Sequence, residues 1–108
     1  IKINFMKKYI FIITTTKTKK NADLISQKIV EEKLSPCVQQ IPGINSLFLW
    51  KNKLQNEEER MLFIKAKSSR VMKIKEIIND FHEYEVPEII TCDFNILNEN
   101  YEKWFNEV

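Results

Sequence analysis

The spacing of hydrophobic residues changes along the chain in an order that predicts alternating strands and helices. Residues 9–16, YIFIITTT, form an unbroken apolar and β-branched run, which is typical of a central strand covered on both faces. From Thr18, a residue type that favours helix N-caps, apolar side chains recur at helical spacing as far as Lys33. The pattern therefore predicts a strand followed directly by an amphipathic helix.

The middle of the chain predicts a β-hairpin. Residues 37–50, CVQQIPGINSLFLW, have strand character that is interrupted by Pro42 and Gly43, a pair typical of a bend or a bulge. The polar residues 51–59 predict a turn, and residues 60–67 predict the returning strand.

The last third of the chain predicts a helix, a strand and a shorter helix. Ser68 or Ser69 can cap the helix, whose inner stripe is Val71, Ile74, Ile78 and Phe81. A connector, HEYEVPEI, leads to a strand over residues 89–96. The terminal helix has an apolar side formed by Tyr101, Trp104 and Phe105.

This order of elements is the split βαβ pattern of an α+β, ferredoxin-like sandwich with an added C-terminal helix. We expect one domain over residues 7–108, preceded by an N-terminal extension at residues 1–6 in which Met6 is a candidate start.

The predicted hairpin is long for a domain of this size. Fourteen extended residues in 37–50 span roughly 45 Å at about 3.3 Å each, whereas a usual strand is about 20 Å long. Since a chain of this length has a radius of gyration of about 13 Å, the hairpin must extend beyond its own sheet. Its end carries LFLW, apolar surface that a monomer would leave in water. We therefore expect self-association.

Composition narrows the class of protein further. The 108 residues carry 17 Lys and Arg against 15 Asp and Glu, a balance that gives no reason to expect a nucleic-acid partner. Cys37 and Cys92 lie too far apart for a CxxC motif, and we expect reduced thiols. The apolar stretch at residues 9–13 is too short to span a membrane. These features favour a cytoplasmic protein without a membrane partner.

Several short motifs together resemble those of the CutA divalent-cation-tolerance family. They are LSPCV at 34–38, PGINSLFLWKNK at 42–53, Glu59, Lys65, HEYEVPEI at 82–89 and NYEKW at 100–104. Motifs in this order over nearly the whole chain are more specific than one short match. The chain departs from the usual pattern at Ser35-Pro36, where the family has two small residues, at Asn52, where it has glycine, and at Glu83, where it has proline.

The resemblance implies a homotrimer of ferredoxin-like subunits whose long strands pair across subunits. It also implies a role in tolerance of divalent metals, above all copper, without an established reaction, so we expect no enzyme. Cu(II) or another divalent metal would bind at or near clefts between subunits. The metal-ligand candidates are His82, Glu88, Cys37 and Glu59, and the cleft-lining candidates are Lys65, Trp50, Tyr84 and Glu85.

His82 is the only histidine, and the sequence leaves two interpretations of it open. A neutral imidazole suits copper or zinc, and Glu85 or Glu88 could complete a mixed nitrogen and oxygen site. Alternatively, His82 ends the second helix, where its ring bonds the last carbonyls and interacts favourably with the helix dipole.

The other candidates also have structural alternatives. A thiolate at Cys37 would favour soft ions such as Cu(I), whereas a free cysteine at a strand start is more often buried, and Cys92 is predicted to be core. Glu59 and Lys65 lie six residues apart, hence on one strand face, where they could hold a small polar ligand, pair across subunits or be solvated. Trp50 fits packing between subunits better than base stacking.

Two rival functions remain from the sequence. One is a trimeric regulator that senses an anionic small molecule, in which Lys65 would matter more than His82. The other is a purely structural or interaction protein whose assembly is its function.

Overall fold

The computed structural model describes residues 8–108, so the predicted extension at 1–6 lies outside the described residues. The elements in chain order are β1 (Tyr9–Thr16), α1 (Lys19–Glu31), β2 (Cys37–Trp50), β3 (Lys53–Lys67), a 3-10 turn (Ser68–Arg70), α2 (Val71–Phe81), β4 (Ile90–Phe94) and α3 (Glu99–Asn106). The predicted order of strands and helices is confirmed.

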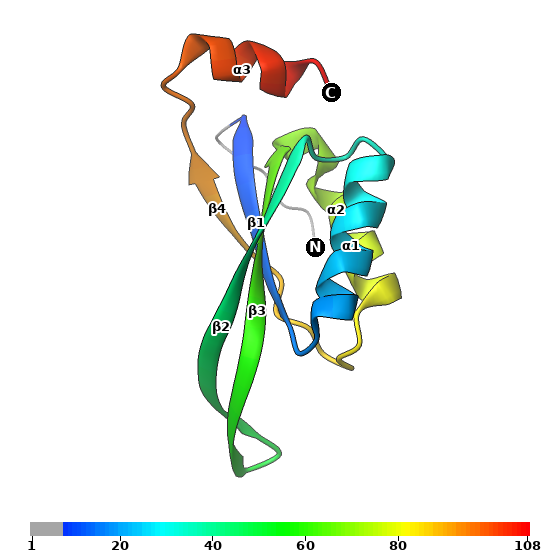
Figure 1. Cartoon of the computed structure of the whole chain (residues 1–108), viewed down its shortest axis with the longest axis vertical. Helices are drawn as coiled ribbons and strands as arrows, with labels where there is room; N and C mark the ends of the chain where they lie inside the picture. The colour runs from blue at the N-terminus through cyan, green and yellow to red at the C-terminus, as the bar shows by residue number, and fades with distance from the viewer. Residues whose placement is uncertain (1–7) are drawn as a thin grey trace.

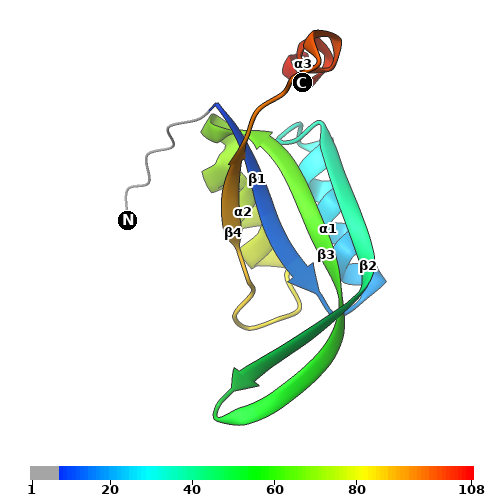
Figure 2. The ribbon, with the colours of Figure 1, turned by 90° about the vertical axis from the view of Figure 1, so that its left-hand side faces the viewer.

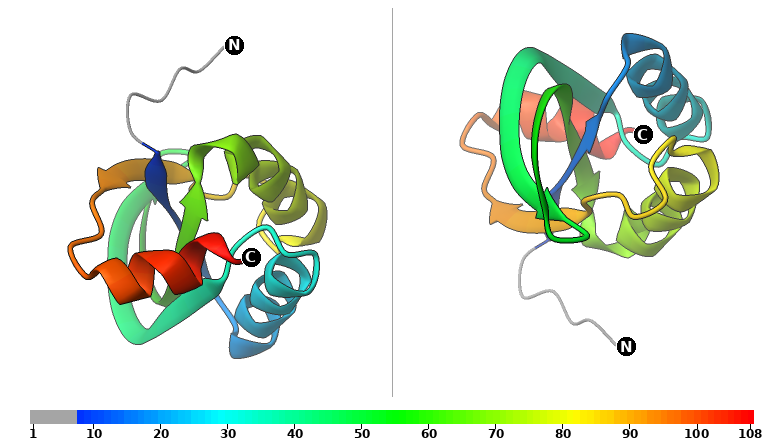
Figure 3. Two further views of the ribbon diagram at one scale, coloured as in Figure 1. Left: turned by 90° about the horizontal axis from the view of Figure 1, so that it is seen from above. Right: turned by 90° about the horizontal axis from the view of Figure 1, so that it is seen from below.

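The four strands form one antiparallel sheet in the order β2-β3-β1-β4. Helices α1 and α2 lie side by side against one face of this sheet, as Figures 1 and 3 show. Helix α3 lies across one end of the sheet (Figure 2). This is the ferredoxin-like arrangement that the pattern predicts.

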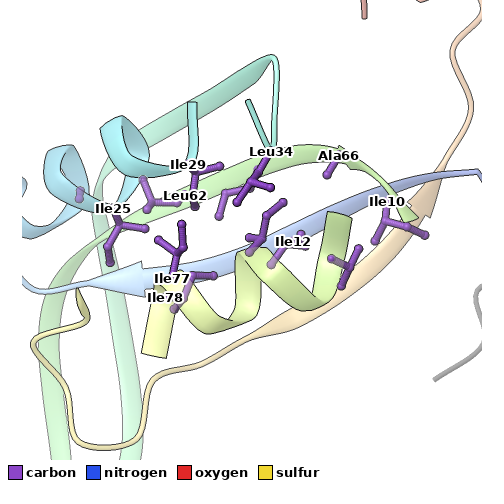
Figure 4. Close-up of a cluster of buried hydrophobic side chains, with 13 residues drawn as sticks. Ile10, Ile12, Ile25, Ile29, Leu34, Leu62, Ala66, Ile77 and Ile78 are labelled. Carbon is purple, nitrogen blue, oxygen red and sulfur yellow. The ribbon is translucent and has the colours of Figure 1, made fainter. Parts of the chain in front are cut away.

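The hydrophobic core lies between the sheet and the two helices (Figure 4). Because side chains alternate between the two faces of a strand, every second residue of β1 and β3 points toward the helices. The fully buried members from these strands and helices are Ile10, Ile12, Ala22, Ile25, Ile29, Leu62, Ile64, Ala66, Ile74 and Ile78. This burial fixes which residues of each strand face away from the helices.

The face of the sheet opposite α1 and α2 is partly open. The register places Cys37, Lys65, Phe11 and Cys92 in one row across the four strands on this face. The prediction that Cys92 is core is wrong, because its thiol is exposed on the edge strand β4. Alternation along β4 turns Cys92 away from the helices.

The β2-β3 hairpin extends beyond the sheet, as its length predicts (Figure 1). Strand β1 stops pairing with β3 at Arg60, whereas β2 and β3 stay paired to the hairpin end, and the molecule is 46 Å long and 29 Å wide. The predicted turn at 51–59 is wrong, since β3 begins at Lys53. The turn is only Lys51 and Asn52, with φ angles of 51° and 63°, as in a type I′ hairpin.

Three local predictions can be compared with the structure. Pro42 and Gly43 do form a bulge, where the register with β3 shifts between Ile41 and Ile44 and Gly43 has a φ of 72°. Thr18 does cap α1 and accepts a hydrogen bond from the Asn21 N–H. The predicted serine cap of α2 is wrong, because the 3-10 turn precedes that helix and no side chain caps it.

Candidate functional site

The connector between α2 and β4 is held against the start of α1 by one buried amide. Asn21, only 8% exposed, donates a hydrogen bond of 2.8 Å from Nδ2 to the Phe81 carbonyl at the end of α2. Its Oδ1 accepts a hydrogen bond of 3.1 Å from the Glu83 N–H. Asn21 therefore satisfies backbone groups on both sides of the point where the connector begins.

The Glu83 side chain makes a second set of contacts between the connector and the start of α1. Its Oε2 accepts hydrogen bonds from the backbone N–H groups of Lys17 at 2.9 Å and Thr18 at 3.1 Å, and Oε1 accepts one from the Thr18 hydroxyl at 3.1 Å. A carboxylate at the first turn of a helix is stabilised by the unpaired N–H groups and the helix dipole. Glu83, where the CutA pattern has proline, therefore fastens the connector to α1.

Both ring nitrogens of His82 have backbone partners. Nε2 lies 2.8 Å from the Thr15 carbonyl, and Nδ1 accepts the Tyr84 N–H at 3.0 Å. These contacts require a neutral ring with its proton on Nε2. Burial lowers the pKa of His82, and this outweighs the opposing effects of the Thr15 carbonyl and of nearby Glu83 and Glu59.

Of the two interpretations of His82, the structural one is confirmed in part, because His82 ends α2 and its backbone N–H donates to the Ile78 carbonyl. The metal-ligand interpretation stays a prediction. The ring bonds β1 and the connector rather than the last carbonyls of α2, and it is neutral rather than a cation at the helix dipole. A metal ion at either nitrogen would have to displace a backbone partner.

A buried carboxylate lies beside the connector. Glu59, only 5% exposed, accepts a hydrogen bond of 2.6 Å from the Tyr84 hydroxyl at Oε2. Burial, and then this bond to the Glu59 carboxylate, raises the pKa of Tyr84 well above its usual range. Tyr84 therefore stays a protonated donor and holds Glu59 in place.

The hairpin and the connector enclose a groove of about 700 Å³ that we call the hairpin groove. Its lining has an acidic part and an apolar part and comprises Thr15, Lys17, Ser46, Leu47, Phe48, Trp50, Gln55, Glu57, Glu59, Glu83, Tyr84, Glu85, Val86 and Glu88. Five glutamates face one lysine in this lining. The groove is therefore suited to cations.

The structure brings five of the eight candidate residues together in this groove, namely Trp50, Glu59, Tyr84, Glu85 and Glu88. It does not bring His82, Cys37 and Lys65 into the lining. Within residues 8–108 no three histidine, cysteine, aspartate or glutamate side chains are close enough to hold one metal ion. The four predicted ligands thus do not form a metal site within one chain.

Lys65 and Cys37 lie as a cross-strand pair on the open face of the sheet. The Lys65 ammonium is 3.3 Å from the Tyr101 hydroxyl and 5.6 Å from the centre of that ring, so α3 already contacts it. Cys37 is half-buried, and its N–H donates to Ser35. Glu59 and Lys65 project from one strand but have different partners. Glu59 contacts Tyr84 of the connector, and Lys65 contacts Tyr101 of α3.

The sequence does not predict the roles of Asn21, Glu57 and Glu83. Asn21 in the first turn of a predicted helix gives no sign that it bonds residues sixty positions away. Glu57 falls within the predicted turn, although the sequence has a run of three glutamates before Arg60. Only the strand alternation, which buries Glu59 and exposes Glu58, separates their roles.

A family model and individual relatives agree on the family that this sequence resembles. The family model described as CutA1 divalent ion tolerance protein matches residues 10–108. "Protein CutA, chloroplastic" of Arabidopsis thaliana is 34% identical over 95 residues, covering 88% of this chain and 52% of that protein. "Divalent-cation tolerance protein CutA" of Thermus thermophilus is 30% identical and covers 89% of this chain and 93% of that protein.

Solved structures resemble this chain over nearly its full length. The crystal structure of CutA1 from Oryza sativa has a TM-score of 0.88 and 32% identity, and covers 94% of this chain and 93% of that one. The chain spans about half the length of the plant and animal relatives it matches. Among the helices of residues 8–108 none is long and apolar enough to cross a membrane. Some relatives' names place them in the chloroplast, so a cytoplasmic location stays a prediction.

Proposed function

Because this chain belongs to the CutA1 divalent ion tolerance family, we propose that it acts as a homotrimer that binds Cu(II) or another divalent cation where the hairpin groove meets a neighbouring subunit. The observation that carries this proposal is the set of five glutamates around the groove. The chain's role in tolerance would then be to hold such ions. This role involves no reaction, in keeping with the expectation that the chain is not an enzyme.

Self-association is supported by the apolar surface of the hairpin. Leu49 is 71% exposed, and Leu47, Leu54 and Val86 are exposed by similar fractions. Leu49 is paired with Leu54 across the hairpin, and Leu47 and Val86 line the hairpin groove, so a second copy seated there would remove them from water. The outer edges of β2 and β4 also offer backbone groups for strand pairing. Assembly as a trimer follows from the family resemblance.

The groove supplies oxygen donors for a divalent cation. Glu59 offers the oxygen that Tyr84 does not bind, and Glu88 is an exposed carboxylate in the same lining. Since one chain does not cluster three such donors, the proposed site needs a neighbouring subunit. Cu(II) is the most sensitive divalent probe, because it binds a given set of nitrogen and oxygen ligands more tightly than the other first-row divalent metals.

The test is a calorimetric titration of Cu(II) into the reduced protein, with the assembly state measured by light scattering. We expect saturable binding to a trimer. The Glu59→Gln variant should bind at least about tenfold more weakly, because it keeps an acceptor for Tyr84 but loses the charge. Glu58→Gln is the matched control, since Glu58 is exposed on the other face of the same strand.

The same titration with His82→Gln and Cys37→Ser tests these two candidate ligands. Loss of binding in either variant, with the trimer intact, would transfer the site from the groove to that residue. A monomer at micromolar concentration, or Cu(II) heats that no variant changes, would contradict the proposed function.

A further inference from the structure

We propose that a small pocket at the end of the molecule opposite the hairpin binds a phosphate group. This basic pocket is lined by Lys33 just after α1, by Lys67 at the end of β3 and by Arg70 at the start of α2, and Phe105 of α3 completes it. Figure 1 shows α3 and the end of α1 at this end of the molecule, away from the hairpin. None of these residues lines the hairpin groove, so the inference is independent of the proposed function.

The charged side chains that line the basic pocket are all cations. They are Lys33, Lys67 and Arg70. The one ion pair among residues 8–108 joins Lys19 to Asp23, so no carboxylate of the described chain pairs with any of the three. Cations that share a pocket repel one another, and an anion bound among them converts this repulsion into attraction.

The backbone at Lys33 gives a second, independent reason to look for a ligand. Helix α1 ends in a Schellman motif, in which the Leu34 N–H donates to the Ile29 carbonyl at 3.1 Å and the Lys33 N–H donates to the Val30 carbonyl at 2.9 Å. Lys33 has a φ of 59°, and glycine is the usual residue at this place in the motif. A lysine at a positive φ is less stable than a glycine. The fold therefore does not explain the lysine, whereas an anion in the pocket does.

The same hydrogen bonds make the end of α1 tolerant of an anion. The C-terminus of a helix carries a partial negative charge on its unpaired carbonyls, which would repel a phosphate group. Because the Ile29 and Val30 carbonyls are both satisfied by the chain that follows, this negative end is weakened next to the basic pocket.

The shape of the basic pocket fits one oxygen of a tetrahedral anion. Its volume is about 10 Å³, enough for a single oxygen-sized atom, so the rest of the anion stays in the open mouth. Leu34 and Phe105 are 7% and 0% exposed and give the pocket an apolar floor. An apolar floor strengthens the attraction between the bound oxygen and the surrounding cations, because the local dielectric is low.

The donors favour a phosphate group over a carboxylate. The guanidinium of Arg70 can donate two parallel hydrogen bonds to two phosphate oxygens. The Lys67 ammonium contacts the Asn106 carbonyl at 3.5 Å, a long bond that leaves its other protons for a ligand. Three positive charges match a dianion with several acceptor oxygens better than a single carboxylate.

The test is a calorimetric titration of inorganic phosphate into the metal-free, assembled protein at constant ionic strength, with sodium chloride as the blank. A second titration uses glycerol 3-phosphate. We expect saturable binding of at least one of the two. Tighter binding of glycerol 3-phosphate would assign the pocket to phosphate monoesters, and tighter binding of inorganic phosphate would assign it to the free ion.

Three variants locate the binding. Arg70→Gln should weaken it at least about tenfold, because the charge-assisted hydrogen bonds are lost. Lys33→Gly should weaken it about threefold and at the same time raise the Tm, because glycine suits the positive φ. Lys20→Gln is the matched control and should change binding less than about twofold, because Lys20 is exposed in the first turn of α1, at the other end of that helix.

Two results would overturn the proposal. The first is heats of both phosphates that are no larger than those of the salt blank. The second is saturable binding that Arg70→Gln and Lys33→Gly weaken no more than Lys20→Gln does. Circular dichroism and light scattering check that each variant folds and assembles as the wild type does. Weaker binding by Lys33→Gly together with a higher Tm could not be caused by unfolding, so the proposal stays testable even if Arg70→Gln fails to fold.

Discussion

Replacing Asn21 by alanine tests whether one amide holds the connector in place. The substitution removes the hydrogen bonds to the Phe81 carbonyl and from the Glu83 N–H and leaves both backbone groups without a partner. An unsatisfied buried group costs about 1–3 kcal/mol. The lower end applies here, because Phe81 and Glu83 are themselves exposed and water can reach the connector.

The expected loss is therefore about 2 kcal/mol for two groups, less about 0.5 kcal/mol because alanine favours a helix more than asparagine does. We expect the free energy of unfolding to fall by about 1.5 kcal/mol. Urea unfolding at one protein concentration measures it, since the stability of an assembling protein depends on concentration.

Asn79→Ala is the matched control, because Asn79 is exposed in α2 and gains the same helix propensity without losing a contact. We expect it to be neutral or slightly stabilising. If Asn21→Ala were as stable as Asn79→Ala, the amide would contribute nothing to the connector, and the account of how the groove is positioned would be wrong. Weaker Cu(II) binding by Asn21→Ala would further show that the hydrogen bonds of Asn21 help to position the hairpin groove.

Other predictions address the groove, the histidine and the hairpin. Tyr84→Phe should lower the free energy of unfolding by about 2 kcal/mol in urea, because it removes the only donor to the Glu59 carboxylate among the described residues; an unchanged value would contradict the pairing. The folded state holds His82 neutral through a lowered pKa, so below the unfolded pKa of about 6.5 the unfolded state binds more protons. The contribution of His82 to the free energy of unfolding should therefore be complete above about pH 6.5 and should decrease as the pH falls toward the pKa of the folded state. An NMR titration of the His82 ring in the folded protein should give a midpoint below 6.5. Gly43→Ala should lower the free energy of unfolding by about 1 kcal/mol, because alanine is strained at the positive φ of this position. Asn52→Gly should raise the free energy of unfolding by about 0.5 kcal/mol, because glycine suits a positive φ in the hairpin turn. Thermal unfolding that showed the opposite signs would refute the assigned backbone conformations.

The fold could be predicted because its core elements have clear periodicity. The β1 run, the helical stripes and the Thr18 cap each depend on local sequence, and the structure confirms them. The start of β3 could not be predicted in this way. Residues 53–58 lie in the overhang, outside the hydrophobic core, and are polar except for Leu54, so the sequence shows no alternation of apolar and polar residues that would indicate a strand.

The candidate groove could be predicted only in part. The connector and the hairpin are both predicted, and Glu59, Tyr84 and Glu88 line one groove between them. The error over Cys92 arose because an apolar neighbourhood does not specify which face of a strand is covered. The partners of His82 could not be predicted, because they are backbone groups that only the three-dimensional arrangement brings to the ring.

The connectivity of the sheet has a consequence for the order of folding. The hairpin closes through a two-residue turn, and isolated hairpins form in about 1–10 μs. Strand β1, by contrast, must find β3 and then β4 across long stretches of chain, and such non-local pairing slows folding to about milliseconds. The apolar hairpin end should therefore be formed and exposed before the rest of the domain is complete. During that interval newly made chains at high concentration can associate incorrectly through this surface, so the yield of refolding should fall as the protein concentration is raised.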